Sequence, residues 1–455
     1  MGEEPSISLP LLEKMEIAKK LILSSQRVRI VSHYDADGIT STAILCTMLL
    51  RQRKGFHASI IKDLDRKMFS ILSSEENALI IFSDMGSGQI EEIEKLKCAS
   101  IILDHHHHVR ESKDTNRVVQ INAHSFGING TDEASGATMC YLLAAYLDPI
   151  NKDLVGLSLA GNVGDRQHTG GGLKGINREI LKDAISNGYI KLRHELVLSG
   201  KDISDALYYS TDPYFTGISG NMDGVKAFLS KIGIEPSKKL SELTSKEMRL
   251  LTSMLGLKLL SQGVLPEVVE DMVAERYWSA RERMNVDELE TLVNACGRTG
   301  NEEVGLGLLL GDPDMLSKAR ELYHNFKEKV LKEVREIEKN GAKELSNLYY
   351  VVVDDPSIAG SVAYFALAHF LNPEKPIIAL SYVGDSVKIS ARGSKHLVSK
   401  GLHFAKVCSE GTKAVGGDGG GHNIAAGGTV PKGREMEFLE YANKMIGEQF
   451  SAKKK

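Results

Sequence analysis

Histidine and aspartate side chains crowd into one short segment near the start of the chain. His33, Asp35 and Asp37 occupy alternate positions in VSHYDADGITS, directly after an apolar run. Carboxylates placed this close together repel one another and lose hydration. A positive charge among them would offset both costs, so the segment indicates a bound cation.

Three later apolar runs end in the same residue types. Asp84 closes one run in FSD, the triplet Asp104, His105 and His106 follows another in LDHH, and Asp165 ends a helical run in NVGD. One aspartate after a strand is commonly a helix N-cap. The repetition at every run favours a shared divalent-metal site, because ligands gather at the carboxyl ends of parallel strands.

The ligand types favour manganese. Carboxylate oxygens and imidazole nitrogens without a thiolate suit this ion, and suit magnesium less well because magnesium rarely takes imidazole. So many candidates favour two ions, about 3.5–4 Å apart and bridged by a carboxylate, which would activate water and polarise a phosphoryl oxygen. The candidate metal ligands are His33, Asp35, Asp37, Asp84, His105 and Asp165.

An α/β domain is expected to position these residues. Short apolar runs alternate with helical patterns over residues 1–195, which predicts a doubly wound fold around a parallel sheet. Gly38 is expected to turn the chain sharply after Asp37, and a helix from about Thr40 would point its N-terminus at the site, favouring anions. The expected strands are 28–33, 57–61, 78–84, 99–104 and 117–122.

The rest of the chain predicts three further regions. Residues 196–285 read as a helical insert and 286–345 as a connecting helical region, and strand patterns return in a smaller C-terminal α/β domain, 346–455. The insert carries more large apolar side chains than a small helical layer readily buries, in MRLLTSMLGLKLL and LPEVVEDMVAERYW. These side chains predict a partner surface, with packing on the first domain as the alternative.

Composition limits the classes of function. The 455 residues carry a net charge of −4, which argues against a protein coated with nucleic acid and leaves only local contacts. The five cysteines are scattered, which argues against a disulfide framework or a zinc knuckle. No apolar run reaches the roughly 18 residues of a membrane span, and MGEEPSISLP lacks a signal-peptide pattern. A cytoplasmic protein without a membrane segment is expected.

Several motifs carry a family resemblance. SHYDADG, SDMG, LDHH and NVGD, in this order, resemble the motifs of the DHH phosphoesterase superfamily, and KISAR with GGDGGGHNIAAGG resembles its DHH-associated domain. INAHSFGINGTDEASGA and VNACGRTG further resemble the RecJ branch. The compact length without an appended OB domain is similar to archaeal RecJ-type proteins, which include the nuclease associated with the GINS replication complex.

The resemblance implies roles for the residues that match the motifs. Asp84 is implied to bridge the two ions, His106 to lie near the substrate phosphate or in the supporting shell, and Asp104 to orient His105 through a hydrogen bond. The other ligands divide between a first and a second ion: His33 and Asp35 for the first; Asp37, His105 and Asp165 for the second.

Candidate substrate contacts lie later in the chain. Alternate residues of a strand point to one face, and a glycine run lets backbone N–H groups approach a phosphate, although glycine runs are more often flexible loops. Arg298 in VNACGR matches a substrate-facing arginine of the family, and Asn294 either helps it or caps a turn. The C-terminal candidates are Ser390, Arg392, Gly419, Gly420, Gly421 and His422.

The leading hypothesis is a metal-dependent, RecJ-like exonuclease on single-stranded DNA, with RNA as a second substrate. The resemblance implies degradation from the 5′ end, whereas the residues themselves encode no recognisable polarity. A cleft between the domains would admit an unpaired strand and exclude a duplex. The alternatives are a phosphoesterase of oligonucleotides, cyclic dinucleotides or pyrophosphate, and a replication scaffold bound to GINS.

Overall fold

The computed structural model describes residues 7–108, 110–113 and 116–453, so the expectation about the first six residues lies outside it. The chain divides into two compact units. The first comprises residues 1–195 and 274–323, and the second comprises residues 196–273 and 324–455. Residues 196–273 of the predicted insert share a compact unit with the C-terminal residues, and residues 274–285 belong to the first unit. The domain boundaries themselves stay a prediction.

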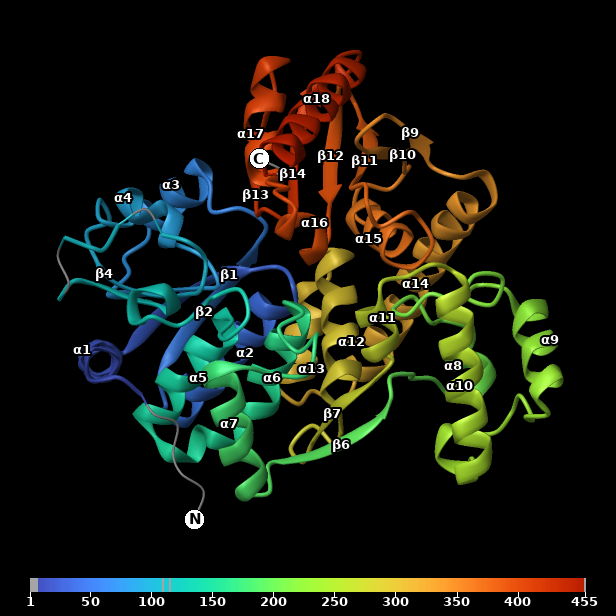
Figure 1. The fold of residues 1–455 in the computed structure, drawn as a ribbon. Coiled ribbons are helices and arrows are strands. Elements are labelled where there is room, and N and C mark those ends of the chain that lie inside the picture. Colours follow the sequence, from blue (N-terminus) through green and yellow to red (C-terminus); the bar gives the residue numbers. More distant parts are fainter. Residues whose placement is uncertain (1–6, 109, 114–115, 454–455) are drawn as a thin grey trace. The chain divides into compact units, whose positions relative to one another are not determined.

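A five-stranded parallel sheet forms the centre of the first unit (Figure 1). Its order is β2-β1-β3-β4-β5, and the pairing of neighbouring strands is parallel throughout, which confirms the predicted α/β fold. Almost all residues of β1, β3, β4 and β5 are buried, whereas the edge strand β2 is partly exposed. The strands are β1 (Arg27–His33), β2 (Gly55–Ile61), β3 (Leu79–Ser83), β4 (Ala99–Asp104) and β5 (Val118–Asn122).

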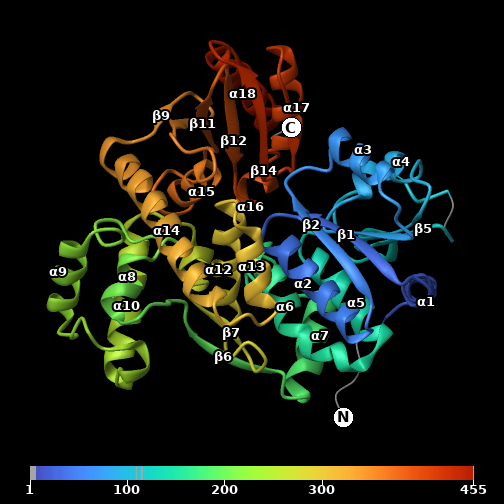
Figure 2. The ribbon, with the colours of Figure 1, turned by 180° about the vertical axis from the view of Figure 1, so that it is seen from behind.

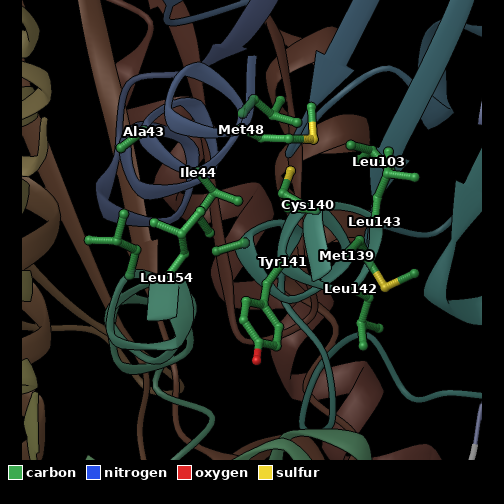
Figure 3. Packing of buried hydrophobic residues seen from close by; sticks show 14 of the residues in the cluster. Ala43, Ile44, Met48, Leu103, Met139, Cys140, Tyr141, Leu142, Leu143 and Leu154 are labelled. Atoms are coloured by element: carbon green, nitrogen blue, oxygen red, sulfur yellow. The ribbon is translucent and has the colours of Figure 1, made fainter. Parts of the chain in front are cut away.

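Helices cover both faces of this sheet. One face packs on a large apolar core built by α1, α2, α5, α6 and α7, whose buried side chains include Met48, Cys140 and Leu143 (Figure 3). The other face packs on Met68 and Leu72 of α3 and on α4. These helices are α1 (Leu9–Ser24), α2 (Ala36–Arg51), α3 (Arg66–Ser74), α4 (Ile90–Ile93), α5 (Gly136–Leu147), α6 (Val155–Gly164) and α7 (Gly175–Ser186).

Helix α2 begins earlier than the sequence suggested. Asp35 is its N-cap and accepts a hydrogen bond from Gly38 N, so Asp37 lies in the first helical turn. Gly38 is therefore not a turn residue. A Cβ there would lie 2.1 Å from the backbone oxygen of His33, so the glycine is needed because β1 and α2 approach closely.

The first unit is completed by segments that follow the insert in sequence. Helix α12 (Val286–Arg298) packs against α6 and α2, and α13 (Glu302–Leu309) packs against α12 and α2. A small sheet in the order β6-β7-β8 is formed by β6 (Ile190–Leu196), β7 (Val273–Ser279) and β8 (Met284–Asn285). The long helix α14 (Met315–Asn340) begins in the first unit and continues in the second.

A six-stranded sheet forms the C-terminal part of the second unit (Figure 2). Its order is β13-β14-β12-β11-β10-β9, and only the β10–β11 pair is parallel among the pairs described. Its elements are β9 (Lys343–Glu344), β10 (Tyr349–Val352), α15 (Ala359–His369), β11 (Ile377–Val383), β12 (Ser386–Arg392), α16 (Lys395–Ser399), α17 (Phe404–Ala414), β13 (Asp418–Gly421), β14 (Ala425–Pro431) and α18 (Glu435–Lys453).

The insert residues of the second unit have an apolar core of their own. Leu251, Leu255 and Leu259 of α10 are fully buried in it together with residues of α8 and α9. The insert helices are α8 (Ile203–Tyr208), α9 (Met222–Ile232), α10 (Ser245–Ser261) and α11 (Pro266–Glu270). Across the described part of the chain, we find no helix with the length and apolarity needed to cross a membrane.

Candidate metal centre

The metal-ligand candidates meet at the carboxyl edge of the first unit's sheet. The neighbouring strands β1, β3 and β4 end at or next to His33, Asp84 and His105. Asp35 and Asp37 begin α2, and Asp165 is the C-cap of α6. The predicted convergence of strand ends is therefore present, with two helix termini contributing the remaining carboxylates.

The donor atoms of these side chains form overlapping groups, in each of which all donor atoms lie within 4.8 Å of one another. One group contains His33, Asp35 and Asp84, and a second contains Asp37, His105 and Asp165. His105 Nε2 lies 3.3 Å from an oxygen of Asp84, so this carboxylate reaches both groups. These are the same residues that the family resemblance assigns to each of two ions, whereas their roles as ligands and the bridging role of Asp84 stay a prediction.

Asp37 is held by the N-terminus of α5. Its two carboxylate oxygens accept hydrogen bonds from Gly136 N at 2.6 Å and from Ala137 N at 2.9 Å, and the residue is 1% exposed. A Cβ on Gly161 would lie 2.3 Å from Asp37 Oδ1, so α6 can approach only because it carries a glycine there. Two backbone donors and the close packing of α6 therefore fix the position of this carboxylate without a cation.

His105 is oriented by a backbone carbonyl. Its Nδ1 lies 2.6 Å from Gly130 O, an acceptor only, so Nδ1 carries the hydrogen and Nε2 presents its lone pair. Nε2 lies 3.3 Å from both Asp84 and Asp165. The expectation that Asp104 orients the His105 ring is wrong, because Gly130 O occupies Nδ1. From His105, Asp104 accepts the hydrogen bond of the backbone N–H alone, at 2.8 Å.

Asp104 instead orients His106. Its Oδ1 lies 2.8 Å from His106 Nδ1 and 3.1 Å from the His106 backbone N, and its Oδ2 accepts from Ser87 N at 3.0 Å. Burial would raise the pKa of Asp104, but the charge and hydrogen bond of His106 outweigh burial and hold it well below the usual range. His106 also belongs to a third group of donor atoms, with Asp84 and His105.

The pKa values of the other candidate ligands are shifted by the close packing of carboxylates in the cluster. Burial and the neighbouring Asp37 raise the pKa values of Asp84 and Asp165 well above their usual range. Burial lowers the pKa of His105, but the surrounding carboxylates, Asp165 first, outweigh it and raise this pKa well above its usual value. Asp84 also adopts a positive φ of 55°, a conformation costly for a residue other than glycine.

These residues fit a divalent-metal centre. Buried carboxylates close to one another are stable only with protons or with a cation among them. The donors are oxygen and imidazole nitrogen, as manganese and related ions prefer, and the described cysteines are free and mostly buried.

Arg298 lies at the edge of the centre. Its guanidinium donates to Tyr34 Oη at 2.7 Å and lies 5.3 Å from the centre of the Tyr34 ring. Burial would raise the pKa of Asp35, but the charge and hydrogen bond of His33, with a smaller contribution from Arg298, lower it below its usual range. Asn294 lies one turn earlier within α12, half-buried, so it caps neither end of that helix. Sequence reasoning missed Tyr34, although it sits between His33 and Asp35 in the first motif.

The C-terminal candidates lie together on the second unit's sheet. In the pairing of β12 with β14, Ser390 lies opposite Gly427, and Gly427 in turn lies opposite Gly420 of β13. Arg392 lies opposite Ala425, and the carbonyl of Ala425 accepts a hydrogen bond from His422 N at 2.8 Å. Gly419 to Gly421 form strand β13, so the reading of this run as a flexible loop is wrong.

Close backbone packing explains these glycines. A Cβ on Gly419 would lie 2.7 Å from Gly427 O, and Gly421 has a φ of 137°. Gly360 has a similar role beside Arg392, because a Cβ there would lie 2.2 Å from the guanidinium. The arginine side chain therefore lies along the start of α15.

Comparison with known families and proteins adds to this geometry. The family described as the DHH family, N-terminal domain, matches residues 27–162, and the DHHA1 domain matches residues 348–448. An uncharacterized protein from Methanocaldococcus jannaschii is 33% identical over 440 residues, which are 95% of this chain and 96% of the relative.

Solved structures share the fold at low identity. RecJ from Thermus thermophilus in complex with Mn²⁺ has a TM-score of 0.60 at 16% identity; the match covers 97% of this chain and 55% of RecJ, so the chain spans about half of that protein. An exonuclease RecJ bound to manganese has a TM-score of 0.56 at 17% identity, covering 96% and 94%. CDC45 from Entamoeba histolytica has a TM-score of 0.67 at 10% identity, covering 96% and 99%.

Proposed function

We propose that the chain, which belongs to the DHH family of phosphoesterases, is a metal-dependent exonuclease that degrades single-stranded nucleic acid from the 5′ end. The observation that carries the proposal is the pair of ligand groups that Asp84 joins. The RecJ structures with this fold support it, since they were solved with Mn²⁺ and, for the Thermus protein, also with Mg²⁺. DNA is the proposed main substrate, with RNA as a second one.

The proposed cofactor is a pair of divalent ions, with manganese preferred to magnesium. When bound, such ions polarise a phosphoryl oxygen and supply a nucleophile near neutral pH. His33 and Asp35 would hold one ion, and Asp37, His105 and Asp165 the other, while Asp84 contributes to both. His106, held by Asp104, would present its remaining ring nitrogen to the phosphate.

Other residues of the chain would hold the substrate. Arg298 presents a cation next to Asp35, where it can bind a phosphate beside the reacting one. Arg392 and His422 are proposed to bind a further phosphate of the strand. Ser390 and the backbone of β13 lie on the same sheet, and together with Arg392 and His422 they form a row of proposed phosphate contacts. Charge-assisted hydrogen bonds of this kind favour a phosphate-rich substrate.

A degradation assay with end-labelled substrates tests the proposal. Single-stranded DNA, single-stranded RNA, duplex DNA and a dinucleotide are each incubated with Mn²⁺, Mg²⁺ or EDTA. We expect single strands to be shortened with Mn²⁺, with loss of a 5′ label first, and no product with EDTA. Degradation of the dinucleotide alone would contradict the exonuclease and favour a small-molecule phosphoesterase.

We further propose that the insert binds a protein partner at the replication fork. Leu250, Leu257 and Leu260 of α10 are exposed by 38%, 59% and 57%. Their spacing places them on one side of the helix, opposite the leucines that the insert core buries. Such an apolar stripe is typical of an interface. The similarity to archaeal RecJ-type proteins makes a GINS subunit the proposed partner.

Charge substitutions in the stripe test this partner. A Leu250→Glu, Leu257→Glu, Leu260→Glu triple variant should lose binding to purified GINS and keep nuclease activity on a free strand. Ile150→Glu is the matched control, because Ile150 is 60% exposed in the first unit. Wild-type GINS affinity in the triple variant would place the partner surface elsewhere.

A further inference from the structure

A hydrogen-bonded chain of buried polar side chains, three amides and one hydroxyl, lies beside the metal centre in the first unit. Gln167, Asn177, Thr138 and Asn162 are at most 2% exposed, and none of them is a metal-ligand candidate. They come from the segment after α6, from α7, from α5 and from α6 itself. Buried polar groups are costly unless their hydrogen bonds are made. The partners of these four side chains therefore indicate what the hydrogen-bonded chain holds in place.

Gln167 is bonded at both ends of its amide. Its Nε2 donates to Gly130 O at 3.1 Å and to Ala134 O at 2.9 Å. Its Oε1 accepts from Asn177 Nδ2 at 2.8 Å. One side chain thus links the loop before α5 to helix α7.

Thr138 continues the chain. Its hydroxyl lies 2.7 Å from Asn177 Oδ1 and 2.7 Å from Asn162 Oδ1, but it has a single hydrogen and donates to one oxygen at a time. With its hydrogen donated to Asn177, the hydroxyl oxygen accepts from Ser135 N at 3.2 Å and can accept from one further donor. A turned Asn162 amide would supply the donor, since its Nδ2 is buried and has no partner among the described residues.

The decisive contact is the carbonyl of Gly130. The same oxygen receives Gln167 Nε2 and the ring Nδ1 of His105, at 3.1 and 2.6 Å. Gly130 lies in an irregular loop in which no strand partner holds its carbonyl. A Cβ on Gly130 would lie 2.0 Å from His105 O, so the loop already approaches His105 as closely as a glycine allows.

The hydrogen-bonded chain also extends to the N-terminus of α5, which holds Asp37. Thr138 forms a capping box with Ser135 at the start of α5. The next N–H groups of that helix, of Gly136 and Ala137, hold the Asp37 carboxylate. Two ligands of the same proposed ion, His105 and Asp37, are therefore positioned by groups at opposite ends of one hydrogen-bonded chain.

We infer that Gln167 and Asn177 are positioning residues of the metal centre. By fixing the Gly130 carbonyl, they keep the hydrogen of His105 on Nδ1 and aim the Nε2 lone pair at the cation. Outer hydrogen bonds of this type change metal affinity by about 10–100-fold. The inference rests on the metal centre of the proposed function, and direct metal binding separates its failure from a failure of the nuclease proposal.

Calorimetric titration of the metal-free, full-length protein with Mn²⁺ tests the inference. Gln167→Met keeps the length of the side chain and removes both donors. We expect its Mn²⁺ affinity at one site to fall by about 10-fold or more. The matched control is Asn151→Ala, since Asn151 is equally buried and its Nδ2 donates to Ala144 O at 2.9 Å, with no contact to the metal ligands.

The thermal unfolding midpoint of each metal-free variant separates positioning from general stability. An affinity loss in Gln167→Met, with wild-type affinity in Asn151→Ala at a comparable drop in midpoint, supports the inference. Wild-type affinity in Gln167→Met overturns it. If Gln167→Met does not fold, Thr138→Val decides: an affinity loss that Thr138→Ser restores supports the inference, and unchanged affinity in Thr138→Val overturns it.

Discussion

The metal-ligand cluster of the first unit and the phosphate-contact residues of the second unit are held in place in different ways. In the first, Asp37, Asp84 and Asp104 are at most 3% exposed, and Asp37 and Asp104 have fixed hydrogen-bond donors. In the second, strand register aligns Ser390 and Arg392 with a glycine-rich edge, and their side chains are half-buried.

The two regions therefore differ in whether they contain side chains that repel one another. The cluster keeps carboxylates together that repel one another, so its stability depends on a cation or on protons. The row on the second sheet brings a cationic side chain, Arg392, next to a glycine-rich edge and has no such cluster of carboxylates. Changes in the cluster should therefore affect chemistry and stability together, whereas changes in the row should affect binding alone.

The largest effect is expected from Asp84→Asn. The variant keeps the shape and removes the charge that both ligand groups share, so hydrolysis should fall by at least about 10³-fold if several kcal/mol of metal stabilisation are lost. The metal-free variant should be more stable than the wild type, because the substitution removes a carboxylate from a buried cluster of carboxylates.

Activity on labelled single strands and thermal unfolding in EDTA measure both parts of this prediction. We expect the unfolding midpoint of metal-free Asp84→Asn to rise by a few degrees, since about 1 kcal/mol corresponds to roughly 2–4 °C. A variant that is fully active, or that is less stable than the wild type in EDTA, would break the distinction between the two regions.

A smaller, one-sided effect is expected from Arg392→Ala. Loss of one charge-assisted hydrogen bond to a phosphate should raise KM on single strands by about 10–100-fold, equivalent to about 1.5–3 kcal/mol. Mn²⁺ affinity and the unfolding midpoint should not change. The control is Arg434→Ala, an exposed arginine of the same unit that pairs with Glu437. An unchanged KM, or a loss of metal in Arg392→Ala, would refute the proposed role.

A change of pH should also act on the cluster. The raised pKa values of Asp84, Asp165 and His105 mean that the folded, metal-free protein holds protons that the unfolded chain releases. Its stability from these groups is complete below their unfolded pKa values, about 4 for the acids and 6.5 for histidine, and declines as pH rises through the folded values.

Metal binding must displace the same protons, so the stabilisation by Mn²⁺ should grow as pH rises. We expect the gap between the midpoints with Mn²⁺ and with EDTA to widen between about pH 6 and pH 8, by at most about 1.4 kcal/mol per pH unit for each proton displaced. A gap that stays constant or narrows would show that the cluster is already deprotonated without metal.

Short motifs predicted the sheet and the location of the cluster well. Apolar runs followed by aspartate or histidine identify β1, β3 and β4 because a parallel sheet brings the ends of its strands together. Local patterns did not show that α2 starts at Ala36, nor that Gly38 serves a close backbone approach. Both depend on how tightly β1 and α2 pack, which the sequence does not state.

Hydrogen-bond partners distant in sequence were the least predictable. Gly130 O orients His105, and Gln167 and Asn177 in turn hold Gly130, yet none of these residues was singled out as a site candidate. Asp104 orients the ring of His106 and not that of His105, because the distant Gly130 carbonyl already binds His105 Nδ1. Pairings of this kind follow from the tertiary fold, so a single sequence carries no local signal for them.

The most direct test of the central claim is anomalous diffraction from crystals of the protein grown with Mn²⁺. The account predicts two anomalous peaks about 3.5–4 Å apart, with His33 and Asp35 on one, Asp37, His105 and Asp165 on the other, and Asp84 between them. A single peak, or two peaks that do not share Asp84, would contradict the proposed centre.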